Sequence, residues 1–329
     1  EMVRDMGIAK SIIDNLGSER SLAMPNVSYR LQPVETLNGD LIAGARSPIG
    51  AQCFILGDFT GHGLPAAIAV LVVHGIFNAM VAKGYSIDHI AAELNRKMRQ
   101  LLPRDRFLAA ALIEIYPDSG TVSVWNGGMP EIIVQRADGR PSKGFRSTRL
   151  PLGVLSAEDF GREPVRRQLG DGDALFVYSD GVTEAMNAAG EMFGRERLQR
   201  CLATYNGADA IEQVGDALAV HVGQVAQADD ISMLHVRFNR EQMLSFSHVT
   251  TPAPASKPPA HWHFAAELSG EALRAADPLP ALSGAMDSLQ GFGQRVSEIC
   301  LIIAELFANA LEHGLLALDS RVKGQVNGY

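Results

Sequence analysis

Aspartates stand at four places where strand-like runs of this sequence begin or end. They are Asp40 in NGD, Asp58 at the end of CFILGD, Asp180 at the end of ALFVYSD, and the pair Asp229 and Asp230 ahead of ISMLHVRF. One such aspartate is usually a turn or cap residue. A buried carboxylate is costly unless a cation compensates its charge. Because the pattern recurs four times, we expect a shared carboxylate cluster.

A cluster of this kind predicts a site for hard divalent cations, because carboxylate oxygens suit Mg²⁺ or Mn²⁺ better than zinc. Two ions bridged by a carboxylate can lower the pKa of a water molecule and hold a phosphoryl oxygen, which is the arrangement used in phosphate-ester hydrolysis. The sequence contains no GxSxG, HExxH, P-loop or GxGxxG motif. The residues therefore favour metal-dependent hydrolysis without a nucleophilic side chain.

The elements that must position these acids lie between Val27 and about Phe238. Apolar runs with strand composition are CFILGD, FLAAALIEIY, TVSVW, EIIVQ, ALFVYSD and ISMLHVRF, and PDSG at 117–120 predicts a hairpin turn between two of them. Strands mostly follow strands along the chain. We therefore expect an α+β fold, a β-sandwich of antiparallel sheets flanked by helices.

A helix is predicted after Pro65, which suits a first helical turn. Its apolar residues share one predicted face, made of Ile68, Leu71, Val72, Gly75, Ile76, Ala79 and Met80. The apolar segment 66–82 is interrupted by His74, Gly75 and Asn78, so it falls short of a predicted membrane span.

Composition bounds the class of protein. The chain has 329 residues, 47% hydrophobic and 20% charged, which allows one large or two medium domains. Its net charge of −8 disfavours a nucleic-acid partner. Cys53, Cys201 and Cys300 form no disulfide framework, and no signal peptide opens the chain. We expect a cytoplasmic protein without a membrane anchor, and a longer natural chain because this one begins at Glu1.

Four segments are expected. Residues 1–20 form an amphipathic helix whose apolar spacing fits either a short coiled coil or packing on its own domain. Residues 21–240 form the domain with the acids. Residues 247–260 are a Pro-rich linker, and residues 261–329 are a second segment with a strong helix near 294–313.

The acid motifs and their order resemble those of metal-dependent type 2C (PPM) protein phosphatases. The motifs are NGD (38–40), LGDFTGHGLPAA (56–67), NGGMPEIIV (126–134), LPLGV (150–154), YSDGVTEAMNAAGEMFGRERL (178–198) and ADDIS (228–232). The similar branch is the bacterial one that dephosphorylates regulators of alternative sigma factors. The resemblance implies a PPM phosphatase fold and a phosphoserine/phosphothreonine phosphatase.

The same resemblance implies the site residues. Asp58 would bridge two Mn²⁺ or Mg²⁺ ions, the Phe59 carbonyl would be a further ligand, and Asp180 and Asp229 would complete the cluster. Asp40 would lie opposite, as a ligand or holding a bound water. Asp230 is favoured as a strand cap rather than a ligand.

Several positions around these motifs are not expected to act on the substrate. His62 is expected to have a structural or supporting role, and Gly61 and Gly63 to serve the backbone. The chain also departs from the branch's pattern: Ala43 stands where a second acid is common, and NGD replaces GGD. Glu35 and Thr36 stand where animal enzymes carry an arginine for the substrate phosphate. Substrate affinity is therefore expected to depend on docking between whole proteins.

The helix near 294–313 carries a polar line of Glu305, Asn309 and His313 beside an apolar stripe, which alone fits a solvated helix face. It also resembles the N-box of the histidine-kinase-type ATPase fold, as found in anti-sigma serine kinases. That resemblance implies Asn309 as a ligand of ATP-linked Mg²⁺ and Glu305 as a base. The DxGxG nucleotide box is absent from the chain, so weak ATP binding is expected.

Two functions follow as hypotheses. The first is a phosphatase acting on a phosphorylated anti-sigma-factor antagonist in a bacterial partner-switching pathway, with serine-kinase activity of a longer chain. The expected partners are that antagonist, an anti-sigma or sigma factor, an upstream receiver or sensor domain, and a second copy of the chain. The alternative is a phosphatase-like scaffold that sequesters a sigma-regulatory partner.

Overall fold

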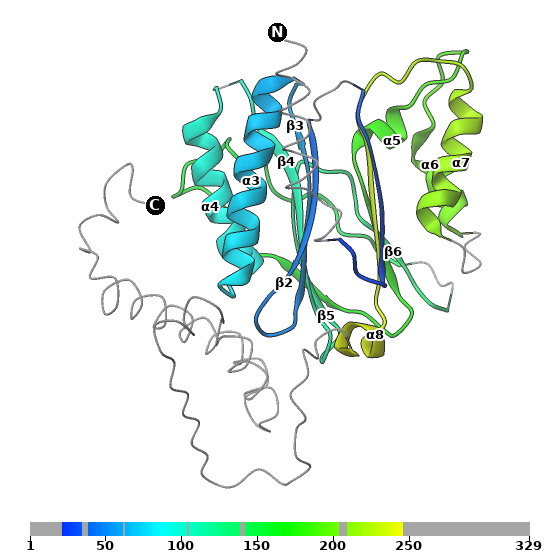
Figure 1. The fold of residues 1–329 in the computed structure, drawn as a ribbon. Helices are drawn as coiled ribbons and strands as arrows, with labels where there is room; N and C mark the ends of the chain where they lie inside the picture. The colour runs from blue at the N-terminus through cyan, green and yellow to red at the C-terminus, as the bar shows by residue number, and fades with distance from the viewer. Residues whose placement is uncertain are drawn as a thin grey trace, which may run out of the picture.

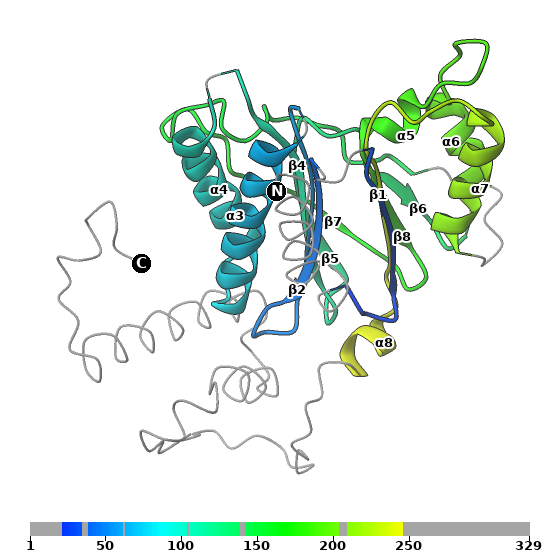
Figure 2. The same cartoon turned by 45° about the horizontal axis from the view of Figure 1, so that its top comes forward.

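The computed structural model describes residues 22–34, 39–61, 63–103, 105–138, 142–203 and 209–245. In this part of the chain two antiparallel sheets face each other, and helices cover the outer face of each (Figure 1, Figure 2). The predicted α+β sandwich is confirmed. The predictions for residues 1–20, 247–260 and 261–329, including Glu305 and Asn309, lie outside the described residues.

The first sheet has five strands in the order β2-β3-β4-β5-β7, all antiparallel to their neighbours. They are β2 (Asp40–Arg46), β3 (Gln52–Phe59), β4 (Leu108–Tyr116), β5 (Thr121–Gly127) and β7 (Val165–Gln168).

The second sheet has four strands in the order β1-β9-β8-β6. They are β1 (Val27–Gln32), β6 (Ile133–Gln135), β8 (Ala174–Tyr178) and β9 (Ile231–Arg237).

The helices form the two outer layers. In Figure 1, α3 (Leu64–Ala82) and α4 (Ile87–Leu101) cover the five-stranded sheet, while α6 (Gly194–Ala203) and α7 (Ala210–Val222) lie over the four-stranded one. The short helix α5 (Asp180–Glu184) follows β8 directly. Helix α8 (Arg240–Ser245) buries Met243 at one end of the sandwich, so the fold continues beyond residue 240.

The core follows the two-residue alternation of the strands. Within β3, Phe54 and Leu56 point between the sheets, where they join a cluster that includes Leu234 of β9. The intervening Cys53 and Ile55 point to the other side and pack with the residues of α3 and α4. Because both faces of β3 are buried, the strand is an almost continuous apolar run, and its closing aspartate stands out in the sequence.

The predicted apolar face of α3 is only partly confirmed: Val72, Ile76 and Met80 are half-buried and pack against the core. The fully buried side chains lie outside that predicted face, and they are Ala66, Ala69, Val70, Val73, Phe77 and Val81. Ile68 of the predicted face is 49% exposed, and Gly75 and Ala79 are exposed as well. The helix is apolar on every side, so its sequence has little periodicity from which a face could be chosen.

The prediction that segment 66–82 falls short of a membrane span is not confirmed, because α3 is long and apolar enough over Pro65–Ala82 to meet the length and composition of one. The packing of its buried side against the five-stranded sheet and α4 accounts for many of these apolar residues. Inside the helix, the Asn78 amide lies within hydrogen-bond distance of the His74 ring nitrogens, at 3.1 and 3.2 Å. These two polar residues therefore satisfy one another across one turn.

The predicted hairpin turn at 117–120 is confirmed. It joins β4 to β5, with Tyr116 paired to Thr121, and the Gly120 amide donates to the Tyr116 carbonyl at 2.9 Å. The run EIIVQ forms a shorter strand than expected, since β6 covers only Ile133–Gln135.

Candidate active site

The first sheet contributes two of the predicted acids. Asp40 begins β2 and Asp58 lies near the end of β3, and the two residues are direct partners across the antiparallel pair. Phe59, whose carbonyl is the predicted further ligand, ends β3 immediately after Asp58. The register of one strand pair therefore brings these three predicted residues together.

The second sheet contributes the other acids at the same end of the sandwich. β8 and β9 are antiparallel neighbours, with Tyr178 opposite Met233. Asp180, two residues beyond the end of β8, thus meets Asp229 and Asp230, which precede β9.

The start of α5 lies against the segment that carries Asp229 and Asp230. A Cβ on Gly181, the residue after Asp180, would overlap the Asp230 carbonyl and would come within 3.6 Å of the Asp229 Cβ. Only glycine allows α5 to begin so close to these two aspartates.

Hydrogen bonds tie the two sheets together at this end. The Ser232 hydroxyl, from β9, donates to the Asp40 carboxylate. The Asp230 carboxylate accepts hydrogen bonds from the amides of Val34 at 2.7 Å and Gly39 at 2.9 Å. Asp230 therefore has a structural role, because its carboxylate binds backbone amides on either side of the segment that leads into Asp40.

Burial and the charges of neighbouring acids make Asp40, Asp58 and Asp180 hard to ionise. Burial raises the pKa of Asp58 to about 7, and the charges of Asp180, Asp229 and Asp230 add to the rise. The pKa of Asp40 is raised well above its usual range, first by burial and then by the charge of Asp58. The pKa of Asp180 is also raised, by burial and then by Asp229. Like charges crowded together in this way favour a bound cation.

The donor set fits a hard divalent cation, because it consists of carboxylates and a nearby backbone carbonyl. Among the described residues, however, no group of three His, Cys, Asp or Glu side chains is close enough to hold a metal ion as it stands. The acids are gathered at one place without forming a closed ligand set. Adjustment of side-chain rotamers is therefore part of any metal binding here.

The glycines after Asp58 have the backbone role that was predicted. Gly61 and Gly63 have φ angles of 87° and 89°, a region that favours glycine, and they turn the chain from β3 into α3. His62 lies outside the described residues.

Sequence reasoning missed several residues that position the site. The Ser179 hydroxyl donates to the Asp230 carbonyl at 3.2 Å and accepts from the Ser232 amide at 3.0 Å. Asn95 of α4, which is buried, accepts from the Gly153 amide at 2.9 Å and donates to the Leu155 carbonyl at 3.0 Å, fixing the LPLGV loop. The signal for Asn95 was a single polar residue on the apolar face of a helix.

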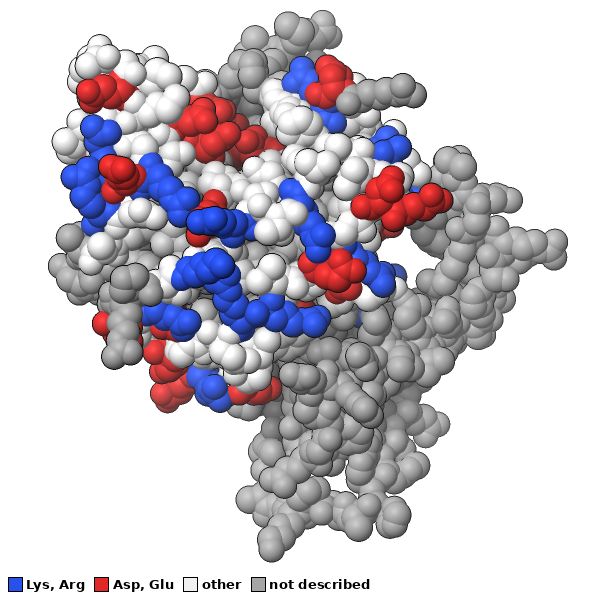
Figure 3. Space-filling view, turned by 180° about the vertical axis from the view of Figure 1, so that it is seen from behind, with Lys and Arg blue, Asp and Glu red and all other residues white. Residues whose placement is uncertain are grey.

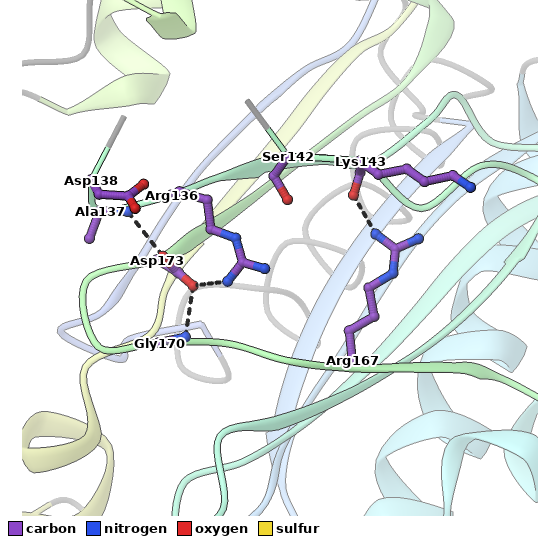
Figure 4. A pocket seen from close by; sticks show the side chains of 8 residues that line it. All are labelled: Arg136, Ala137, Asp138, Ser142, Lys143, Arg167, Gly170 and Asp173. Carbon is purple, nitrogen blue, oxygen red and sulfur yellow. Dashed lines mark hydrogen bonds and ion pairs between the residues drawn. The ribbon is translucent and has the colours of Figure 1, made fainter. Parts of the chain in front are cut away.

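A pocket of about 860 Å³ lies elsewhere, beside the start of β8 (Figure 4). Its lining includes Arg136, Lys143, Arg167 and Asp173. The Asp173 carboxylate accepts from Arg136 Nη1 at 2.5 Å and from the Gly170 amide at 2.7 Å, so one cation of the pocket is already paired. β8 runs from this pocket towards Asp180, which places the two sites at opposite ends of the strand.

Charged side chains are unevenly spread over the surface. On the face seen from behind, Lys and Arg side chains form bands with acidic clusters between them (Figure 3). Some arginines are held in ion pairs, such as Arg195 and Arg146, which both contact Glu131, at 2.6 and 3.4 Å. The net charge of −8 is therefore not uniform over the molecule.

Comparison with solved structures identifies the fold. The SiaA-PP2C domain of Pseudomonas aeruginosa has a TM-score of 0.63 at 20% identity, covering 72% of this chain and 97% of that one. The RsbU and RsbW domains of Rv1364c from Mycobacterium tuberculosis have a TM-score of 0.54 at 19% identity, covering 88% and 75%. The PP2C phosphatase domain of SpoIIE from Bacillus subtilis, solved with a fragment of its regulatory domain, has a TM-score of 0.51 at 16% identity, covering 65% and 61%. The fold is that of PP2C phosphatases.

Sequence relatives agree with this assignment. The phosphoserine phosphatase RsbP of Bacillus subtilis is 24% identical over 191 residues, which are 55% of this chain and 45% of RsbP. Protein IcfG of Synechocystis is 28% identical over 123 residues, 37% of this chain and 19% of IcfG. The chain thus spans less than half the length of these relatives. Residues 48–239, more than half of the chain, match the family described as Stage II sporulation protein E (SpoIIE), and the chain therefore belongs to the SpoIIE family of PP2C-like phosphatases.

Proposed function

We propose that this domain hydrolyses phosphoserine or phosphothreonine on a protein substrate at a centre of two Mn²⁺ or Mg²⁺ ions. Asp58 would bridge the ions, with Asp180, Asp229 and the Phe59 carbonyl as further ligands and Asp40 on the opposite side. When bound, the ions would supply a water of lowered pKa and charge stabilisation at the phosphoryl oxygens. The protein's own backbone and side chains would hold and orient these ligands, and the bound ions would favour the ionised form of the acids.

One observation carries the proposal: four strands from two sheets bring carboxylates separated by up to 190 positions in sequence to one end of the sandwich. Ionising Asp58 at this place is unfavourable. Burial, and then the charges of Asp180 and Asp229, raise its pKa to about 7. Burying acids at such a cost has a purpose when a cation compensates them.

The test is phosphate release from a phosphoserine protein with Mn²⁺, with EDTA, and with an Asp58→Asn variant. Asp216→Asn is the matched control, because Asp216 is an exposed aspartate on α7. Release that requires Mn²⁺, disappears in Asp58→Asn and persists in Asp216→Asn would support the proposal. Mn²⁺ binding without release from any substrate would favour the scaffold that sequesters a partner. Failure to bind Mn²⁺ would overturn the metal centre.

The substrate we propose is a phosphorylated anti-sigma-factor antagonist, within a partner-switching pathway that includes an anti-sigma or sigma factor. The support is family membership together with the relative RsbP, which is named as a phosphoserine phosphatase. Incubation of the chain with such a phosphorylated antagonist, followed by phosphate release, tests this step. Equal rates on unrelated phosphoproteins would contradict it.

For residues 261–329 we propose the N-terminal part of a histidine-kinase-like ATPase, with Asn309 and Glu305 directed at Mg²⁺-linked ATP. The support is the N-box resemblance and the Mycobacterium tuberculosis structure, which contains RsbU and RsbW domains. Binding of a fluorescent ATP analogue by the chain, compared with an Asn309→Ala variant, tests it. Equal binding by both would count against the assignment.

A further inference from the structure

Arg106 lies directly against the turn that follows Asp58 and Phe59. Its Nη1 donates to the Thr60 carbonyl at 2.5 Å, and among the described residues Thr60 is the hydrogen-bond partner of this guanidinium. The side chain is exposed. A guanidinium has five N–H donors, and the hydrogen bond to Thr60 engages one of them among the described residues.

The loop that carries Arg106 is fixed to the site. The Phe107 amide donates to Thr60 Oγ1 at 2.9 Å, and the Thr60 amide donates to the Phe107 carbonyl at 3.1 Å. The Arg106 amide is itself bonded to the Pro103 carbonyl at 3.0 Å. These bonds place the arginine beside β3 independently of its own side chain.

Gly61 allows the close approach of the guanidinium. A Cβ on Gly61 would overlap Arg106 Nη1 and would lie 3.3 Å from Nη2. A Cβ built on Gly39 would lie 3.1 Å from the Gly61 carbonyl, 3.5 Å from Asp230 Oδ2 and 3.7 Å from the Phe59 carbonyl. The Gly61 backbone that the guanidinium packs against therefore lies beside Gly39, whose other close neighbours are the Asp230 carboxylate and the Phe59 carbonyl.

Charge explains why a cation would be useful at this position. The five aspartates of the cluster carry about −5 when ionised, whereas two divalent ions would bring about +4. A phosphoserine adds a charge of about −1.5 to −2 at neutral pH. The loaded centre would thus have no surplus of positive charge for a dianion. An exposed arginine beside Gly61 would supply it, and its planar fork matches phosphate oxygens.

We propose that Arg106 binds the phosphoryl group of the substrate, in place of the arginine that this chain lacks at Glu35 and Thr36. The inference rests on the proposed phosphatase function and names the residue that gives that site its affinity for phosphate. It predicts that phosphate recognition depends on the α4–β4 loop.

The experiment compares the chain with Arg106→Gln, Arg106→Lys and Arg240→Gln. Arg240 is the matched control: its Nη1 also donates to a backbone carbonyl, that of Asp118 at 2.7 Å, in the turn at the other end of β4. The binding of inorganic phosphate to the Mn²⁺-loaded protein is measured by calorimetry. The affinity for Mn²⁺, and kcat and KM for a phosphoserine peptide, are measured on the same samples.

Arg106→Gln is expected to weaken phosphate binding and raise KM by about tenfold, with Mn²⁺ affinity undiminished. Arg106→Lys keeps the positive charge but loses the planar guanidinium. Its phosphate affinity and KM should lie between those of the unmodified chain and those of Arg106→Gln. Arg240→Gln should match the unmodified chain, and the Arg106 effect should shrink as salt is raised.

Unchanged phosphate affinity and KM in Arg106→Gln, with the unmodified chain active, would overturn this inference and leave the phosphatase proposal intact. A loss of Mn²⁺ affinity in Arg106→Gln would also overturn it, because the arginine would then support the turn after Asp58 and Phe59 and not the substrate. If the unmodified chain neither binds nor releases phosphate, both proposals fail.

Discussion

Asp40 and Asp58 lie directly opposite one another on β2 and β3 at a buried strand end, where the charge of Asp58 raises the pKa of Asp40 and a side-chain hydrogen bond with Asp40 lowers the pKa of Asp58. Because buried acids are crowded at this end of the sandwich, with Asp180 and Asp229 nearby, the stability of the metal-free domain should depend on pH.

The metal-free domain should lose stability as pH rises from about 4 to about 7. The pKa of Asp58 is about 7 in the folded chain against a usual value of 3.8, so the folded state binds more protons than the unfolded state in this window. Melting in EDTA should therefore occur at a lower temperature at pH 8 than at pH 5.5. Mn²⁺ should raise the melting temperature most at pH 8, where the ligands are ionised. A melting temperature in EDTA that does not fall with pH would contradict this prediction.

Replacing Ser232 with alanine should weaken metal binding. The Ser232 hydroxyl donates to Asp40 and favours its ionised form, so its loss should raise the pKa of Asp40 further. One such hydrogen bond corresponds to about 1 kcal/mol, which is about a fivefold loss of Mn²⁺ affinity at pH 7. Titration with Mn²⁺ checks this, with Ser28→Ala as the control because the Ser28 hydroxyl contacts Asp209 on the surface. Equal affinities in the two variants would argue against the role of Ser232.

Two substitutions on α3 compare a fully buried residue, Phe77, with an exposed residue of the predicted apolar face, Ile68. Phe77→Ala should cost about 3–5 kcal/mol of unfolding free energy, because Phe77 is fully buried in the cluster between α3 and the sheet. Ile68→Ala should cost well under about 1 kcal/mol, since the side chain is half exposed. Urea denaturation measures both. Similar costs would show that α3 is packed on both sides in the whole chain.

Glu114→Gln should stabilise the domain above pH 7 and change little at pH 4.5. Glu114 lies on β4 with 4% exposure, and burial raises its pKa to about 7. As with Asp58, the folded state holds the proton more tightly than the unfolded chain. Stability is therefore lost as pH rises towards 7, by up to about 3 kcal/mol. Denaturation at pH 4.5 and pH 8 checks this.

Glu93→Gln is the matched control for Glu114→Gln, because Glu93 is a surface partner of Arg96 on α4. It should have a small effect that does not depend on pH. An equal effect of Glu114→Gln at both pH values would mean that the carboxyl stays ionised inside the sheet.

The sequence predicted the sandwich class and most of its strands because β3, β4, β5, β8 and β9 are dense in apolar residues. It did not indicate β1, whose sequence VSYRLQ is largely polar, or β2, where Gly44 and Ala43 dilute the pattern. It also did not indicate β7, whose sequence VRRQ suits a charged edge strand. The face of α3 was only partly predicted, because the helix is apolar on every side and its sequence has little periodicity. In each case tertiary packing decided what local composition left open.

For the site, the aspartates were found because acids stand out at the ends of apolar runs. Ser232 and Ser179 were not found, since a serine in a strand carries no signal of its own until its partner is known. Arg106 was missed for the same reason: its meaning comes from Gly61, which is 45 positions earlier in the chain. Whether the acids bind metal stays a prediction.

The pairing of β1 with β9 has a consequence for synthesis. Val27 lies opposite Val236, and Asp40 depends on a hydroxyl from Ser232, so residues from both ends of the domain complete one site. A chain still emerging from the ribosome has made Asp40 and Asp58 long before Asp229 exists. Contacts over such distances form late in folding. If the site acts as we propose, the nascent protein would have no activity until β9 is released, and any truncation before β9 would remove Asp229, Asp230 and Ser232 together.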